Sequence, residues 1–180
     1  MSRLGIISDT HGDARGWGEA RSVWGEVEAI LHAGDVLYHG PRNPLPEAYG
    51  PKALAGAMNE SPVPLFIARG NCDAPVDQNM LRWPLLSPLV PLWWEGKFIL
   101  LSHGENFTEV REMALHSGAS LVITGHTHVA SVQREESTIF LNPGSASLPK
   151  GRDPASAALL DSREIVIFTL QGDILHREPW

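Results

Sequence analysis

An aspartate and a histidine, Asp9 and His11, stand one residue apart directly after a short apolar run near the start of the sequence. The run, residues 4–7, has the length and the β-branching of a buried strand, and Gly12 lets the chain turn sharply after it. Carboxylate and imidazole groups bind transition metals, and open α/β sheets place their chemistry at the carboxyl ends of strands. Taken alone, the pair is better explained by Asp9 as the N-cap of a following helix.

The same arrangement recurs along the chain, however, because four later apolar runs also end in polar side chains. These predicted strands lie at residues 29–33, 64–68, 97–102 and 120–124. The side chains that follow them are Asp35, Asn71, His103, His126 and His128. Carboxylate, imidazole and amide groups without thiolates favour Mn²⁺, Fe²⁺, Co²⁺, Ni²⁺ or Zn²⁺ over Ca²⁺ or an iron–sulfur cluster. The donors exceed what one tetrahedral ion needs, so we expect two ions, about 3.5–4 Å apart, that share one carboxylate.

The segments between these runs predict the elements that hold the donors in place. The spacing of apolar residues indicates helices over residues 13–28, 52–59 and 107–116. The end of the chain is β-rich, with predicted strands at residues 129–134, 137–141, 155–160 and 165–170 and a hairpin at Gly172-Asp173. His32 lies within the second apolar run, where a hydrogen-bonded core histidine is the better interpretation.

Residues 36–51 are rich in glycine, proline and asparagine and form an unusually long connection, which predicts a loop. Long loops held over a scaffold often carry function, so His39, Arg42 and Asn43 are candidates. A solvated surface excursion explains each of them equally well.

Trp83, Trp93 and Trp94 lie near several prolines in the most apolar irregular region of the sequence. We interpret them as a satellite of the core, with a subunit interface as the second choice because aromatic residues concentrate there. Residues 85–94 are too short to span a bilayer, and Pro88 and Pro91 interrupt them.

The composition is that of an ordinary globular protein, and 180 residues suit a single domain over residues 1–180. A net charge of −7 argues against nucleic acid as a partner, because nucleic-acid-binding surfaces are basic. The one cysteine, Cys72, predicts a reducing compartment. The sequence starts directly in a strand without the features of a signal peptide, so we expect a cytoplasmic protein without membrane contact.

Five short motifs, in this order, resemble the signature of the calcineurin-like metallophosphoesterases. They are Asp9-x-His11, Gly34-Asp35, Gly70-Asn71, His103-Gly104 and Gly125-His126-Thr127-His128. Residues 34–43, 70–73 and 142–145 further resemble the bacterial YfcE-type phosphodiesterases, and this likeness covers nearly the whole chain. The resemblance implies an α/β fold, a four-layer α/β/β/α sandwich of two mixed sheets flanked by helices.

The resemblance also implies two bound divalent cations, with Mn²⁺ in first place and Fe, Co, Ni or Zn as alternatives. The first cation would be held by Asp9, His11, Asp35 and His128. The second would be held by Asp35, Asn71, His103 and His126, with Asp35 bridging the two. The implied reaction is the attack of a metal-bridging hydroxide on a phosphodiester, which requires no nucleophilic side chain.

This chain departs from many members of the family at two positions. A histidine often follows the motif asparagine, and an aspartate often lies three residues after the bridging one, but here these positions hold Cys72 and Tyr38. Protonation of the leaving group would then come from water, from His39 or from nothing, so we expect a preference for acidic leaving groups such as aryl alcohols. We predict that His39 or Arg42 grasps the ester, and we take both, together with Asn71, as catalytic candidates.

Two alternatives to a phosphodiesterase stay open at this point. One is a phosphomonoesterase or nuclease that uses the same metals. The other is a non-catalytic scaffold, since the retromer subunit of this fold serves as one, although a scaffold has no need for the full ligand set. The expected partner is a small phosphodiester substrate, and the sequence leaves a homo-oligomer open.

Overall fold

A computed structural model describes residues 2–86 and 89–180 and contains two mixed β-sheets. The larger sheet has the strand order β12-β11-β10-β1-β2-β3-β4, and the smaller has the order β5-β6-β7-β9-β8. The larger sheet comprises β1 (Arg3–Ile7), β2 (Ala29–His32), β3 (Leu65–Ala68), β4 (Leu85–Leu86), β10 (Ser156–Asp161), β11 (Glu164–Thr169) and β12 (Ile174–Pro179). The smaller comprises β5 (Leu89–Trp94), β6 (Lys97–Ser102), β7 (Leu121–Ile123), β8 (Ala130–Glu135) and β9 (Thr138–Pro143).

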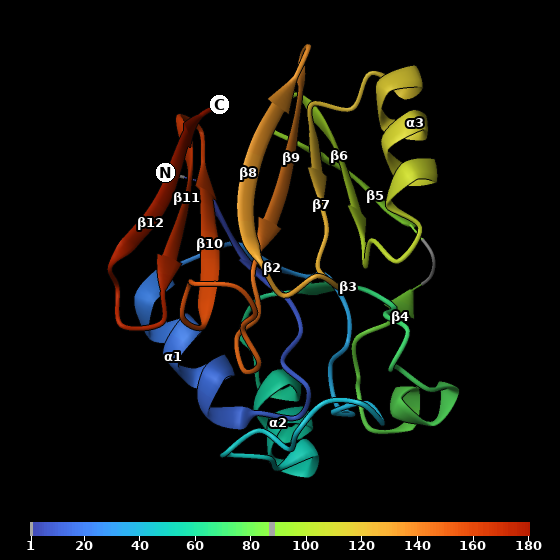
Figure 1. Cartoon of the computed structure of the whole chain (residues 1–180), viewed down its shortest axis with the longest axis vertical. Helices are drawn as coiled ribbons and strands as arrows, with labels where there is room; N and C mark the ends of the chain where they lie inside the picture. The colour runs from blue at the N-terminus through green and yellow to red at the C-terminus, as the bar shows by residue number, and fades with distance from the viewer. Residues whose placement is uncertain (1, 87–88) are drawn as a thin grey trace.

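Helices cover the outer face of each sheet, so the chain forms the expected four layers (Figure 1). Helices α1 (Ala14–Trp24) and α2 (Pro51–Asn59) pack on the larger sheet through one apolar cluster. Helix α3 (Phe107–Ser117) packs on the smaller sheet through another. The central core lies between the sheets, where side chains such as Leu31 and Ile123 are fully buried. A short 3₁₀ helix, η1 (Pro75–Asn79), lies in the connection between β3 and β4.

Parallel pairing in both sheets directs the ligand-bearing strand ends to one place. Strands β1, β2 and β3 run parallel to one another, as do β6, β7 and β9. The loops that leave the carboxyl ends of β1, β2, β3, β6 and β7 therefore gather at one edge of the sandwich. Asp13 rather than Asp9 is the N-cap of α1, because the Asp13 carboxylate accepts a hydrogen bond from the Gly16 N–H at 3.0 Å.

The structure corrects three expectations about the elements. Helix α1 ends at Trp24 instead of residue 28, because Gly25 adopts a positive φ of 62° and ends the helix. The stretch expected to be irregular contains β4 and β5, and Pro91 is tolerated because β5 is an edge strand paired only with β6. Pro88 lies outside the described residues. Trp93 is 74% exposed and so does not belong to the core.

The other two tryptophans pack against the core as expected. The Trp83 indole donates to the Met58 carbonyl at 2.8 Å and lies against the cluster under α1 and α2. Trp94 packs on the central core and its indole donates to Glu28. None of the helices in the described part of the chain is long and apolar enough to cross a membrane.

We expect Gly5→Ala to destabilise the fold, because Gly5 lies against the ring of Trp24. A Cβ at Gly5 would come within 2.7 Å of that ring, while Gly56 in α2 has nothing within 4 Å. Overpacking of this kind costs about 1–3 kcal/mol of unfolding free energy. Gly56→Ala is the matched control and should stabilise the protein by about 0.4–1 kcal/mol. Urea unfolding measures both, and equal effects from the two changes would contradict the packing argument.

His32 is the hydrogen-bonded core histidine that the sequence indicates. It is fully buried in β2, and its Nδ1 accepts from the Gly34 N–H at 3.1 Å. The Thr10 hydroxyl donates to the Val36 carbonyl at 2.9 Å, so at its 3.0 Å contact with His32 it accepts from the Nε2–H. Burial lowers the pKa of His32 to about 4, and protonation would also break the bond to Gly34.

We therefore expect His32 to make the fold sensitive to mild acid. The unfolded chain has the higher histidine pKa, so it binds the proton first and stability falls as the pH drops from about 6.5 to 4. The loss from this residue amounts to about 3 kcal/mol of unfolding free energy across that range. To isolate the effect of this residue, the measurement is the difference between wild type and His32→Gln in chemical unfolding at pH 7.5 and pH 4.5. Parallel stability profiles for the two proteins would refute the assignment.

Candidate metal centre

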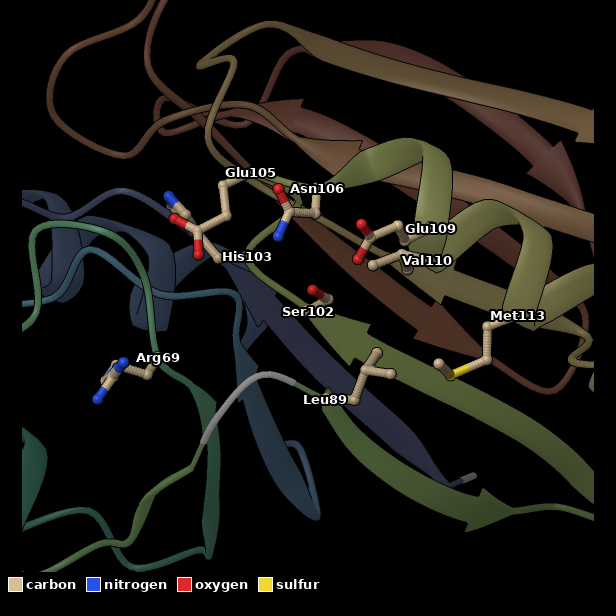
Figure 2. A pocket seen from close by; sticks show the side chains of 9 residues that line it. All are labelled: Arg69, Leu89, Ser102, His103, Glu105, Asn106, Glu109, Val110 and Met113. Carbon is tan, nitrogen blue, oxygen red and sulfur yellow. The ribbon is translucent and has the colours of Figure 1, made fainter.

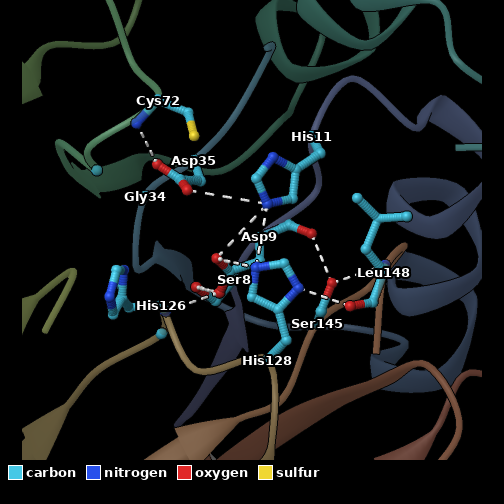
Figure 3. A network of polar contacts seen from close by, with 12 residues as sticks. Ser8, Asp9, His11, Gly34, Asp35, Cys72, His126, His128, Ser145 and Leu148 are labelled. Atoms are coloured by element: carbon cyan, nitrogen blue, oxygen red, sulfur yellow. Dashed lines mark hydrogen bonds and ion pairs between the residues drawn. The ribbon is translucent and has the colours of Figure 1, made fainter. Parts of the chain in front are cut away.

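The predicted donors lie together at the edge where the strand ends meet. Asp9 and His11 follow β1, Asp35 follows β2, and the remaining donors follow β3, β6 and β7. Figure 3 shows Asp9, His11 and His128 facing one another, with Asp35 on the side of His11. Most of the set is buried, but Asn71 and His126 are exposed. The cluster is therefore closed on the protein side and open to solvent on one side, as a catalytic metal site requires.

One group of contacts joins the donors expected for the first cation. The Nε2 atoms of His11 and His128 lie 3.3 Å apart, and His128 Nε2 lies 3.2 Å from Asp9 Oδ1. His11 Nε2 lies 3.8 Å from both Asp9 Oδ1 and Asp35 Oδ2. The ligand atoms of Asp9, His11 and His128 all lie within 4.8 Å of one another, so one small ion could contact all three.

A second group joins the donors expected for the second cation. Asn71 Oδ1 lies 3.1 Å from His103 Nε2 and 2.9 Å from His126 Nδ1. His103 Nε2 is 3.4 Å from Asp35 Oδ2, the same oxygen that faces His11 in the first group. Asp35 Oδ2 therefore lies between the two groups, and His126 faces the second group through Nδ1.

Backbone carbonyls fix which ring nitrogen of three histidines faces the centre. Nδ1 of His11 donates to the Tyr38 carbonyl at 2.8 Å, and Nδ1 of His103 donates to the Ala33 carbonyl at 2.8 Å. Nδ1 of His128 donates to the Leu148 carbonyl at 2.6 Å. These bonds orient the rings and leave each Nε2 available as a ligand, which is the usual support of a metal-binding histidine.

One buried oxygen without a hydrogen-bond partner also indicates that the donor set can bind a cation. Asp9 Oδ1 is buried and has no hydrogen-bond partner among the described residues. His128 Nε2 lies 3.2 Å from it, on a ring whose Nδ1 donates to the Leu148 carbonyl. A buried carboxylate oxygen without a hydrogen bond is costly, and a bound cation would satisfy it. The residues present therefore suit a metal.

The backbone at the donors is held in an uncommon conformation. Asp9, His11, Asp35, His126 and His128 all have φ between 44° and 66°, in the left-handed region. Among the described non-glycine residues, only Glu95 and Glu136, both at hairpin turns, share it. Such residues cost stability and cluster at functional sites. The fold therefore maintains this geometry at the expense of local strain.

Two sets of side chains that the sequence reasoning missed hold the loops. The Asp73 carboxylate accepts from the N–H groups of Asp35, Val36 and Gly70 at 2.7–2.9 Å, which ties the loop after β2 to the loop after β3. The hydroxyls of Ser145 and Ser147 both donate to the Asp9 carbonyl. The only sequence signal for each was a segment similar to the related phosphodiesterases, residues 70–73 and 142–145. Nothing in the sequence indicated these hydrogen bonds.

The charges of the cluster shift the pKa values of its members. Burial raises the pKa of Asp9 and of Asp35, but neighbouring histidines lower both by more, so both carboxylates are ionised. Burial lowers the pKa of His103, but the bond to Asp35 and the charge of Asp9 raise it to about 9. Burial and the nearby Asp35 raise the pKa of the Cys72 thiol to about 12, so this thiol is neutral.

A cleft of about 630 Å³ opens over the donors, and it distinguishes the two loop candidates. Arg42 and Lys150 line it, and within residues 2–86 and 89–180 neither forms an ion pair. Lys150 was not predicted from the sequence. His39 is outside the cleft lining, between Tyr38 and Tyr49, so the structure brings Arg42 and Asn71 to the site and leaves His39 beside it. A smaller hollow of about 110 Å³ lies beside His103, between Arg69 and α3 (Figure 2).

The fold and the site define a metal-dependent phosphoesterase, and comparison with known families agrees. The model of the calcineurin-like phosphoesterase superfamily domain matches residues 2–164, so the chain belongs to that superfamily. It is 36% identical over 172 residues to phosphodiesterase YfcE of Escherichia coli K12, covering 94% of this chain and 93% of that protein. A probable metallophosphoesterase of Methanothermobacter thermautotrophicus is 30% identical, with 97% and 90% covered.

Solved structures agree on the architecture. The E. coli Yfce phosphoesterase superposes with a TM-score of 0.87 at 31% identity, covering 98% of each chain. Vacuolar protein sorting 29 from Cryptosporidium parvum has a TM-score of 0.67 at 17% identity, covering 99% of this chain and 97% of that one. The second likeness is one of fold alone.

Proposed function

We propose that this protein is a metal-dependent phosphodiesterase with a dinuclear centre, and that Mn²⁺ is its preferred metal. The observation that carries the proposal is the position of Asp35, whose Oδ2 faces His11 of one donor group and His103 of the other. A carboxylate shared in this way is the mark of a two-metal hydrolytic site. The similarity to phosphodiesterase YfcE supports diesters as the substrate class.

Cations held by these residues would supply the charge that attracts a phosphate and would lower the pKa of an attacking water. The residues of the chain do the rest. Arg42 and Lys150 project from the loops after β2 and β9 into the cleft, where their charges bind the phosphate oxygens. Asn71 and His126 lie on the solvent-facing side of the donor cluster. The hydrogen bonds from His11, His103 and His128 to backbone carbonyls fix the positions of their Nε2 atoms.

Neither Cys72 nor His39 is suited to protonate the leaving group. Cys72 stands where many family members carry a histidine, and its raised pKa makes its thiol a poor proton donor at neutral pH. His39 lies outside the cleft lining. We therefore propose that the enzyme works best on diesters whose leaving groups are acidic, because these depart without a proton.

Turnover of matched substrates tests this function. With Mn²⁺ we expect hydrolysis of bis(p-nitrophenyl) phosphate, much less of p-nitrophenyl phosphate, and little of single-stranded DNA. Across a series of aryl methyl phosphates, log kcat/KM should fall steeply as the pKa of the leaving phenol rises. Faster turnover of the monoester would show that the enzyme is a phosphomonoesterase instead. A kcat/KM that does not depend on the pKa of the leaving phenol would refute the proposal that a proton donor is missing.

Arg42→Ala should raise KM for the diester more than it lowers kcat, because the residue is placed to bind phosphate oxygens. Arg152→Ala, an exposed arginine outside the cleft lining, is the matched control. Wild-type kinetics in Arg42→Ala would show that Arg42 does not bind the substrate.

A further inference from the structure

A second hollow of about 300 Å³ adjoins the metal cleft, at the lower end of the size range of small-molecule sites. It lies between the loop after β2, the start of α2 and the end of η1. Tyr38 and Tyr49 from the loop, together with Met80, give it mainly apolar walls. Lys52 and Asp77 add one charge of each sign.

His39 braces the two tyrosines that form this hollow. Its ring packs edge-on against Tyr38, with ring centres 4.6 Å apart, and against Tyr49 at 5.2 Å. The His39 carbonyl accepts a hydrogen bond from the Asn43 side chain at 2.9 Å, which holds the loop closed on itself. His39 therefore packs against both aromatic walls of the hollow, and it is not among the residues that line the metal cleft.

Tyr38 connects the hollow to the metal centre. It lines both the hollow and the cleft over the donors, and its ring side chain is exposed. Its carbonyl accepts the hydrogen bond from His11 Nδ1 at 2.8 Å, so its position is tied to that of a metal ligand. A substituent on a phosphate bound at the centre can therefore run across Tyr38 into the hollow.

The chemistry of the hollow selects a flat ring with polar edges. Tyrosine rings and a methionine thioether pack well against aromatic faces. The Lys52 ammonium can donate hydrogen bonds. The Asp77 Oδ2 accepts from the Ala74 N–H, and within the described residues the other oxygen of Asp77 has no hydrogen bond and can accept one. Apolar faces combined with donors and acceptors on the edge describe a nucleobase.

We propose that the hollow between Tyr38 and Tyr49 binds the base of a nucleoside phosphodiester, with His39 as a positioning residue for its walls. This inference rests on the proposed phosphodiesterase function and names the substrate class for it. It also gives His39 a part different from the ester-binding or proton-donating one that the sequence suggested.

Two esters with the same leaving group test the subsite. The p-nitrophenyl ester of thymidine 5′-phosphate and p-nitrophenyl methyl phosphate differ only in the group that remains on phosphorus. Stacking of a base on aromatic side chains contributes about 1–3 kcal/mol, so kcat/KM should be about 5- to 150-fold higher for the nucleoside ester. The gain should appear mainly as a lower KM.

Met80→Trp should fill the hollow and abolish the preference for the nucleoside ester. Met80 is 43% exposed, so folding tolerates the change, and Met113→Trp on α3, at a methionine 50% exposed in the hollow of Figure 2, is the matched control. His39→Ala should reduce the preference and His39→Phe should restore it, since phenylalanine can pack between the tyrosines but cannot donate a proton.

The outcomes separate the two proposals. Equal kcat/KM for the two esters, or a preference that survives Met80→Trp, overturns the subsite while leaving the phosphodiesterase intact. Loss of methyl-ester turnover in both His39 variants would make His39 a catalytic group and overturn its positioning role. Failure of the wild-type enzyme with Mn²⁺ to hydrolyse either ester would overturn the phosphodiesterase function itself, and the subsite with it.

Discussion

An Asp35→Asn variant is expected to lose Mn²⁺-stimulated diester hydrolysis by at least about 10³-fold in kcat/KM. Asp35 Oδ2 is the oxygen that faces both donor groups, at 3.8 Å from His11 and 3.4 Å from His103. An amide removes one negative charge and offers a weaker ligand to both cations at once. Asparagine tolerates the left-handed backbone found here, so the fold should survive the change.

The measurement combines steady-state kinetics with metal analysis of the same protein. Bound metal per chain should fall along with activity, whereas the far-ultraviolet circular dichroism should stay that of wild type. Asp173→Asn makes the same chemical change at an exposed hairpin position and should leave both quantities unchanged. Full activity in Asp35→Asn at saturating Mn²⁺ would contradict a shared carboxylate.

Mn²⁺ at about 100 times its dissociation constant should raise the midpoint of thermal unfolding of the metal-stripped protein by about 5–10 °C. Two ionised aspartates, an orphaned Asp9 oxygen and inward-facing imidazole nitrogens are brought close together in the folded chain. A cation that binds these groups only in the folded state would satisfy the orphaned Asp9 oxygen and stabilise the fold by mass action.

Differential scanning fluorimetry with and without chelator measures this shift across a series of Mn²⁺ concentrations. Asp35→Asn should show a much smaller shift, and Asp173→Asn should behave as wild type. Mg²⁺ should give less stabilisation at equal concentration, because imidazole ligands suit the transition metals better. An unchanged midpoint in the presence of demonstrably bound Mn²⁺ would contradict preferential binding of the cation to the folded state.

The sequence indicated which polar side chains gather at one edge of the sandwich, because each follows directly from the end of a strand. Parallel pairing of β1 with β2 and of β6 with β7 then brings together residues as distant as Asp9 and His128. The periodicity of apolar residues indicated these strands, and the order of the motifs indicated the layered fold. Local signals therefore sufficed where a strand and its donor are contiguous.

Features that depend on contacts between loops could not be predicted from the sequence. Nothing local in the sequence shows that the Asp73 carboxylate bonds two separate loops, or that Lys150 returns to the cleft. The histidine tautomers depend on carbonyls far away in the chain, such as Leu148 for His128. Strand β5 escaped prediction because Pro91 argues against a strand, and only its place at the sheet edge makes the proline acceptable.

The left-handed backbone conformation at the proposed metal donors lowers the stability of the fold in exchange for activity. A glycine at His126 would relax the backbone there and delete an imidazole from a crowded group, so the metal-stripped protein would resist heat better while turning over nothing. Laboratory evolution that rewards heat resistance in a chelating buffer would therefore drift toward inert variants. Only a screen that rewards turnover can keep the donors in place.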